Sequence, residues 1–228
     1  MLLSKQNILD EVKIAISKYP NLDSHLLLNK AEKVIETNQT LSQQNVIELL
    51  ILEALSFVSE EQPEWSYVCA HLYLHTLYEN TMEVRSQAKP YKGFYEMIVS
   101  LINKGIYNPI LLSTYTAEEI NELENTIDVS KDSLFTYIGI KTLADRYLAR
   151  DHEKQIWELP QERFMIIAMV LMQKENKENR IQLVKEAYWA LSNLYMTVAT
   201  PTLANAGKTY GQLSSCFIDT VDDSLQGI

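Results

Sequence analysis

Apolar residues recur at helical spacing through the first 86 positions of the chain. Ile8, Val12 and Ile16 follow one another at intervals of four, which places their side chains on one face of a helix. This helix should end at Tyr19, because the residue before a proline disfavours helical backbone. Together with the same kind of pattern further on, this predicts four helices over residues 5–86, ending at about 19, 36, 59 and 85.

Further helices are expected beyond residues 87–90, a short polar stretch that reads as a domain boundary. The sequence Thr116-Ala117-Glu118-Glu119 has the residues of a capping box, in which Thr116 and Glu119 each satisfy an unpaired backbone amide at a helix start. Pro160 suits a first helical turn and opens a very apolar helix that should be buried on all sides. The expected helices cover 91–103, the residues after 116, 134–145, 160–173 and 180–198.

Two segments depart from the helical period. Residues 147–150 and 155–158 flank a polar turn, which predicts a β-hairpin. After Thr200-Pro201-Thr202, which should end the preceding helix, Leu213 to Thr220 reads as a strand and Asp222 begins a new turn.

Composition supports a mainly α-helical protein. Only 6 of the 228 residues are glycine and 6 are proline, and 46% are hydrophobic. The net charge of −10 argues against nucleic-acid binding, which needs clustered Lys and Arg. Two cysteines cannot form a disulfide scaffold, no signal peptide is evident, and the most apolar run is nine residues long. We therefore expect a cytoplasmic protein without a membrane span.

Isolated candidates for chemistry are few. His71 and His75 are four residues apart on a predicted helix and could share a zinc ion, but the glutamate of the His-Glu-x-x-His pattern is missing, so paired surface or interface histidines are favoured. Cys69, on the same helix, is expected to be a small buried hydrophobe. Glu60-Glu61 and Glu118-Glu119 read as solvated helix or cap positions.

The last 30 residues carry the most specific signal. They include Ala199-Thr200-Pro201-Thr202-Leu203-Ala204-Asn205-Ala206-Gly207, Gln212-Leu213-Ser214-Ser215-Cys216-Phe217-Ile218-Asp219 and Asp222-Asp223-Ser224-Leu225. This succession resembles the start of the catalytic barrel in the large (alpha) subunit of aerobic class I ribonucleotide reductase. Trp157-Glu158-Leu159-Pro160-Gln161 is similar to the Glu-x-Pro-Gln segment of that family, and the resemblance covers roughly residues 60–228.

The resemblance implies roles for three residues of the tail. Cys216 resembles the cysteine that acts as a reduced thiol towards the ribose 2′ carbon and then forms a disulfide with a later cysteine. Thr200 and Ser215 resemble residues that hydrogen-bond the substrate nucleotide, Thr200 at its phosphate end. A transiently oxidised cysteine must first be a free thiol, and loop hydroxyls and amides can accept an anionic phosphate without net positive charge.

The resemblance also implies regulation and partners. Asp223, Ser224 and Leu225 resemble the start of the site for a deoxynucleoside triphosphate effector. The expected partners are a ribonucleoside diphosphate, this effector, the rest of the large subunit, thioredoxin or glutaredoxin, and a small subunit that carries a radical-generating metal cofactor. No cofactor or metal is expected in this chain itself.

Three domains are expected on this basis: residues 1–86, similar to a degenerate ATP-binding cone without its basic hairpin; 87–198, the helical domain of the reductase; and 199–228, the start of a ten-stranded α/β barrel. The later cysteines and radical-relay tyrosines of the family lie beyond Ile228. We therefore expect an N-terminal fragment that is inactive alone. The alternative is an acidic, all-helical interaction protein with a remnant reductase tail.

Overall fold

The computed structural model describes residues 5–37 and 40–224. Within these ranges the chain forms α-helices, one 3-10 helix and two isolated β-bridges. The prediction of a mainly α-helical protein is confirmed. The start of a barrel is not seen among the described residues.

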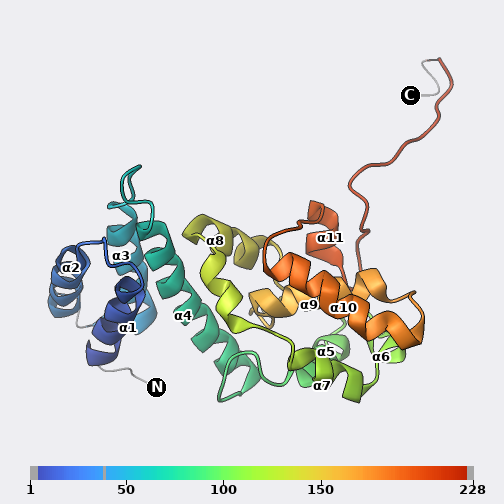
Figure 1. Ribbon diagram of the computed structural model, residues 1–228, viewed down its shortest axis with the longest axis horizontal. Coiled ribbons are helices and arrows are strands. Elements are labelled where there is room, and N and C mark those ends of the chain that lie inside the picture. Colours follow the sequence, from blue (N-terminus) through green and yellow to red (C-terminus); the bar gives the residue numbers. More distant parts are fainter. Residues whose placement is uncertain (1–4, 38–39, 225–228) are drawn as a thin grey trace.

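Four helices make up one end of the molecule, as the spacing of apolar residues predicts (Figure 1). Their buried faces meet in a common core that includes the fully buried Val12, Leu27, Leu50 and Val68. The four helices are α1 (Lys5–Ser17), α2 (Ser24–Thr37), α3 (Gln43–Leu55) and α4 (Trp65–Arg85).

Helix α4 packs on two sides. Its residues Trp65 and Val68 lie in the core of the first four helices, whereas Leu74 and Leu77 pack in a second cluster with Ile140 and other residues of α8 (Tyr137–Arg146). The helix thus connects the two halves of the molecule (Figure 1). The division at residue 86 stays a prediction.

The second half contains helices arranged around α9 (Pro160–Met172). The capping box at Thr116 is formed, because its hydroxyl accepts from the Glu119 amide at 3.2 Å and the Glu119 carboxylate accepts from the Thr116 amide at 2.8 Å. The other elements are α5 (Phe94–Asn103), α6 (Ile110–Thr114), α7 (Ala117–Glu124), the 3-10 helix η1 (Val129–Leu134), α10 (Lys177–Ser192) and α11 (Thr200–Asn205).

Helix α9 is buried on all sides, as predicted. Every residue from Pro160 to Val170 is buried, and α10 packs along the helix. At 13 residues α9 is too short for a bilayer, and no other helix in the described ranges is long and apolar enough to cross one.

The predicted β-hairpin at 147–158 is reduced to a single bridge between Arg150 and Ile156. The cause is Asp151, whose side chain accepts the backbone amides of Glu153 and Gln155 at 3.1 and 3.0 Å and the Trp157 indole N–H at 2.8 Å. A side chain that takes up amides in this way competes with the pairing of strands. The segment is a short hairpin in which the Asp151 amide still donates to the Gln155 carbonyl at 3.1 Å and the Trp157 amide to the Ala149 carbonyl at 2.9 Å.

Two helix boundaries also differ from the prediction. Helix α10 ends at Ser192 rather than near residue 198, because Leu194 adopts left-handed backbone with φ +59°. Thr200-Pro201-Thr202 does not end a helix but begins α11, with Pro201 in the first turn, where its missing N–H costs nothing.

Candidate functional site

The residues expected to carry chemistry lie at and after α11. Thr200 is exposed at the start of α11, and Ser215 and Cys216 are exposed on the segment that follows, with Ser215 Oγ 3.7 Å from Cys216 Sγ. Asp223 and Ser224 are exposed farther along, and Leu225 lies outside the described residues. The structure therefore does not gather these residues into one closed site.

The strand predicted from Leu213 to Thr220 is not formed. The segment is exposed and runs away from the helices (Figure 1). A strand needs a neighbouring strand to pair its amides and carbonyls, and none lies beside the segment in the described part of the chain. The pattern of side chains is that of a strand, but the pairing partner is missing.

The beginning of this segment is firmly anchored. The Thr202 hydroxyl donates to the Leu213 carbonyl at 2.8 Å, and the Asn205 amide donates to the Gln212 carbonyl at 2.9 Å. Gly207, with φ +77°, turns the chain so closely over α9 that a Cβ atom there would lie 2.7 Å from Ile166 Cγ2. The chain therefore leaves the helices in a defined place.

A buried ion pair between Arg163 and Glu158 fixes the position of α11 against α9. Arg163 of α9 donates its Nε to the Leu203 carbonyl at 2.9 Å and its Nη2 to the Ala206 carbonyl at 2.6 Å. Its Nη1 lies 3.5 Å from Glu158 Oε1, and neither side chain is exposed. Glu158 also accepts from the Tyr107 hydroxyl and from the Ala149 amide. Because α11 begins with Thr200, this pair fixes where that residue is presented.

A second buried network surrounds Asp132 of η1. Its carboxylate accepts from the hydroxyls of Tyr78 and Tyr91 and, at 2.7 Å, from the Gln161 side-chain amide. Burial raises the pKa of the Asp132 carboxyl to about 6, while the three donors act in the opposite direction. Gln161 also accepts from the Tyr188 hydroxyl at 3.3 Å, so this network joins α4, η1, α9 and α10.

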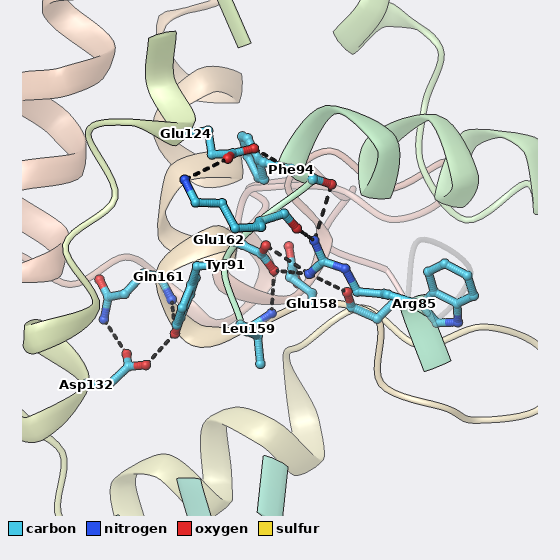
Figure 2. Close-up of polar contacts among 12 residues, drawn as sticks. Arg85, Tyr91, Phe94, Glu124, Asp132, Glu158, Leu159, Gln161 and Glu162 are labelled. Atoms are coloured by element: carbon cyan, nitrogen blue, oxygen red, sulfur yellow. Dashed lines mark hydrogen bonds and ion pairs between the residues drawn. The ribbon is translucent and has the colours of Figure 1, made fainter. Parts of the chain in front are cut away.

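A third network joins the end of α4 to the start of α9. Figure 2 shows Arg85 pointing at Glu162, whose two carboxylate oxygens each accept from Arg85 Nη1 at 2.9 Å. Arg85 Nη2 also donates to the carbonyls of Lys92 and Gly93, and Glu162 accepts the Leu159 amide at 2.8 Å. Burial raises the pKa of the Glu162 carboxyl, and the Arg85 guanidinium opposes this effect.

His71 and His75 do share one face of α4, as their spacing predicts. Each has a ring nitrogen 3.6 Å from Glu11 Oε2 of α1, and Lys18 Nζ lies 3.4 Å from His71 Nδ1. They line a cavity of about 300 Å³ between α1, α4 and η1. No group of three potential ligands with the geometry of a metal site occurs in the residues that the structure describes.

Cys69 is buried on α4, as predicted. Its thiol lies 3.7 Å from the Ile51 carbonyl, and burial raises the pKa of the thiol to about 12. A thiol with so high a pKa has almost no thiolate at neutral pH and is chemically inert.

The role of the charged residues around Pro160 is not evident from the sequence resemblance alone. Glu158, Gln161, Glu162 and Arg163 are all fully buried, and their side chains bond to residues of distant segments such as Tyr107, Asp132, Arg85 and Leu203. The signal that could have found them is the placement of four polar residues beside an apolar run, since buried charges are rarely tolerated without partners. Their partner Arg85, 77 positions away from Glu162, carries no such signal.

Known proteins resemble most of this chain. Residues 133–211 match the family described as ribonucleotide reductase, all-alpha domain. The chain is 38% identical over 182 residues to a protein of Treponema pallidum named ribonucleoside-diphosphate reductase subunit alpha. Proteins of the same name from Helicobacter pylori and Enterobacteria phage T4 are each 36% identical, over 194 and 181 residues.

These matches cover 80%, 85% and 79% of this chain, in the same order, but only 21%, 24% and 23% of the relatives. The chain thus spans about a fifth to a quarter of the length of the relatives that it matches. The residues that match the all-alpha domain hold α8, α9, α10 and α11 (Figure 1). This chain belongs to the family of ribonucleoside-diphosphate reductase alpha subunits, oxidoreductases of which it corresponds to a partial, N-terminal piece.

Proposed function

We propose that this chain supplies the helical N-terminal part of a ribonucleoside-diphosphate reductase large subunit, together with the first segment of its catalytic barrel. The observation that carries the proposal is the family membership over about four fifths of the chain, combined with an exposed, strand-patterned segment beside which no strand lies in residues 5–37 and 40–224. Residues 199–228 then belong to the active site of the assembled enzyme, and residues 5–198 are the platform that presents them.

Cys216 is the residue that we assign to the redox chemistry. Its thiol and that of a second cysteine each give one electron and one proton, the ribose 2′-hydroxyl leaves as water, a C–H bond replaces the C–O bond, and the two sulfurs form a disulfide. Thioredoxin or glutaredoxin would reduce this disulfide again. The exposure of Cys216 fits a thiol that must meet both a substrate and a second cysteine.

Thr200 and Ser215 are proposed to bind the substrate, and Asp223, Ser224 and Leu225 to begin the site of a deoxynucleoside triphosphate effector. The buried pair of Arg163 and Glu158 supports the first assignment, because it fixes α11. The radical would come from a small subunit with its own metal cofactor, and the complex would work in the cytoplasm.

The chain alone is expected to be inactive. The only cysteine besides Cys216 in these 228 residues is Cys69, which is buried in a different part of the fold, so the second thiol must come from polypeptide outside them. The first 86 residues are proposed to pack or to bind a partner rather than to switch activity with ATP, since the basic hairpin of an ATP-binding cone is missing.

Co-expression tests this proposal. The chain would be produced together with the Treponema pallidum alpha subunit from which the matching segment has been deleted, and then supplied with small subunit and thioredoxin. We expect formation of deoxycytidine diphosphate that Cys216→Ser abolishes and the matched control Cys69→Ala retains. Turnover by the pure chain, or turnover that survives Cys216→Ser, contradicts the proposal. The latter result would favour an acidic interaction protein with a remnant tail.

A further inference from the structure

An apolar groove opens between α8, α9, α10 and α11. It has a volume of about 350 Å³ and is lined by Phe135, Ile138, Phe164, Leu191 and Leu203 among others. None of the described residues that line it carries a charge. Figure 1 shows these helices together in the half of the molecule from which the C-terminal segment departs.

One rim of this groove displays large apolar side chains to solvent. Leu194, Tyr195 and Met196 follow the end of α10 and are 49%, 76% and 40% exposed, and Ile138 across the groove is 73% exposed. Tyr195 stacks on the exposed Trp189, with ring centroids 5.2 Å apart. A cluster of exposed aromatic and aliphatic side chains of this kind is typical of an interaction surface.

The backbone at this rim is also strained. Leu194 has φ +59°, a conformation that side-chain-bearing residues rarely adopt and that glycine adopts freely. The strained turn ends α10 and directs three successive apolar residues outwards. The exposed apolar side chains and the strained backbone of Leu194 both lower the stability of the isolated chain. Backbone strain of this kind is found where a local geometry serves a function.

We infer that this apolar groove is the docking surface for the part of the alpha polypeptide that pairs with residues 213–224. The inference rests on the proposed function. The relatives contain about three to four times as much polypeptide outside the matched segment as within it. Leu203 in the groove adjoins Thr202, whose hydroxyl holds the Leu213 carbonyl, so a polypeptide that pairs with the exposed segment comes to lie at the groove.

The lining determines the chemistry of the occupant. A groove without charged residues favours an aliphatic or aromatic side chain, since a charged group would lose its hydration without gaining a partner. Leu194 and Met196, which both line the groove, would then be central contacts.

Affinity between the two polypeptides tests the inference. This chain and the Treponema pallidum alpha subunit without its matching segment would be co-expressed, and their dissociation constant measured without substrate. Met196→Glu and Leu194→Gly should each weaken binding about tenfold or more, because each removes an apolar contact that docking buries. Leu52→Glu, at a 63% exposed leucine of α3, should leave binding unchanged.

Leu194→Gly separates docking from folding. Glycine accepts the left-handed backbone, so the thermal stability of the free chain should be retained or increased while docking weakens. The deleted Treponema segment, supplied in place of this chain, shows that the partner is competent. Failure of the wild-type chain to bind such a competent partner overturns the inference, and so does equal binding by the groove variants.

Because this test measures binding alone, its outcome is independent of Cys216. Unaltered binding by the groove variants, with turnover that Cys216→Ser abolishes, rejects the groove and keeps the proposed function. Weakened binding by the groove variants, with turnover that survives Cys216→Ser, keeps the groove as a docking surface and rejects the proposed role of Cys216.

Discussion

Residues 158–163 and residues 213–224 are both rich in polar side chains, but the first segment is buried and the second is exposed to solvent. Around Pro160, every carboxylate and guanidinium is buried and bonded to segments that come from elsewhere in the chain. After Leu213, side chains as apolar as Phe217 and Ile218 are exposed to solvent. The comparison teaches that the environment of a segment depends on whether its partners are present, and only weakly on its own composition.

The largest expected effect comes from breaking a buried ion pair. Arg85→Met leaves the Glu162 carboxylate buried without its countercharge and should cost about 3–5 kcal/mol in the free energy of unfolding. Glu162→Gln in the same chain should restore part of this loss, because the amide oxygen can still accept from the Leu159 amide. Urea unfolding measures both.

A matched control for this prediction is Lys92→Met. It removes an ion pair with Glu124 in which the lysine is 59% exposed, and it should cost less than about 1 kcal/mol. Equal losses in Arg85→Met and Lys92→Met would contradict the view that burial determines the effect.

Asp132 should make stability depend on pH. Its pKa is raised from 3.8 to about 6 in the folded state, so protonation favours folding. This contribution is fully present below pH 3.8 and is lost as the pH rises through 6. Relative to Asp132→Asn, the wild-type chain should therefore gain up to about 3 kcal/mol between pH 7 and pH 4.

Urea unfolding at several pH values checks this dependence. Asp222→Asn, in the exposed C-terminal segment, serves as the control and should leave the curve unchanged. A stability difference between wild type and Asp132→Asn that is the same at pH 4 and pH 7 would show that the buried carboxylate does not titrate as expected.

Two glycines with similar backbone extend the comparison. Gly207→Ala places a methyl group 2.7 Å from Ile166 Cγ2 in the core, and Gly105→Ala places one in open space. Both positions have φ above +70°, so both variants carry backbone strain of about 1 kcal/mol. Gly207→Ala should cost about 2 kcal/mol more, from packing, in thermal or urea unfolding. A similar loss of unfolding free energy in both variants would mean that the Ile166 side chain moves away from the added methyl group at little cost.

The smallest effect is expected in the exposed segment. Ile218→Ser should change the free energy of unfolding of this chain by less than about 0.5 kcal/mol, because the side chain is fully exposed. In the complex with the remaining alpha polypeptide the same change should weaken assembly. A large loss of stability in the chain alone would show that the segment packs against the helices in solution.

Much of the fold can be predicted from the sequence where signals are local. The four N-terminal helices, the capping box at Thr116 and the burial of α9 follow from spacing and turn chemistry, and all are confirmed. The predicted hairpin is formed only as one bridge, because the Asp151 side chain takes the Gln155 amide and the Glu158 carboxylate takes the Ala149 amide. The strand predicted at 213–220 is not formed among the described residues, because strands require partners that periodicity does not reveal.

The residues of the candidate site can be predicted from the sequence only through the family resemblance. Cys216, Thr200 and Ser215 are found through resemblance, and their roles stay predictions, because their environment depends on polypeptide outside this chain. Asp132 and Arg85 could not be found in this way, since their contacts with residues 54 and 77 positions away leave no local pattern. Long-range pairing of charges is a property of the folded chain.

The unequal environments of the two cysteines have a practical consequence. The chain has only Cys69 and Cys216, and burial raises the pKa of Cys69 to about 12, whereas Cys216 is exposed. A maleimide dye or a nitroxide should therefore attach at Cys216 alone, without any engineering of the chain. These 228 residues thus carry a single built-in reporter position, from which the ordering of the segment during assembly can be followed in real time.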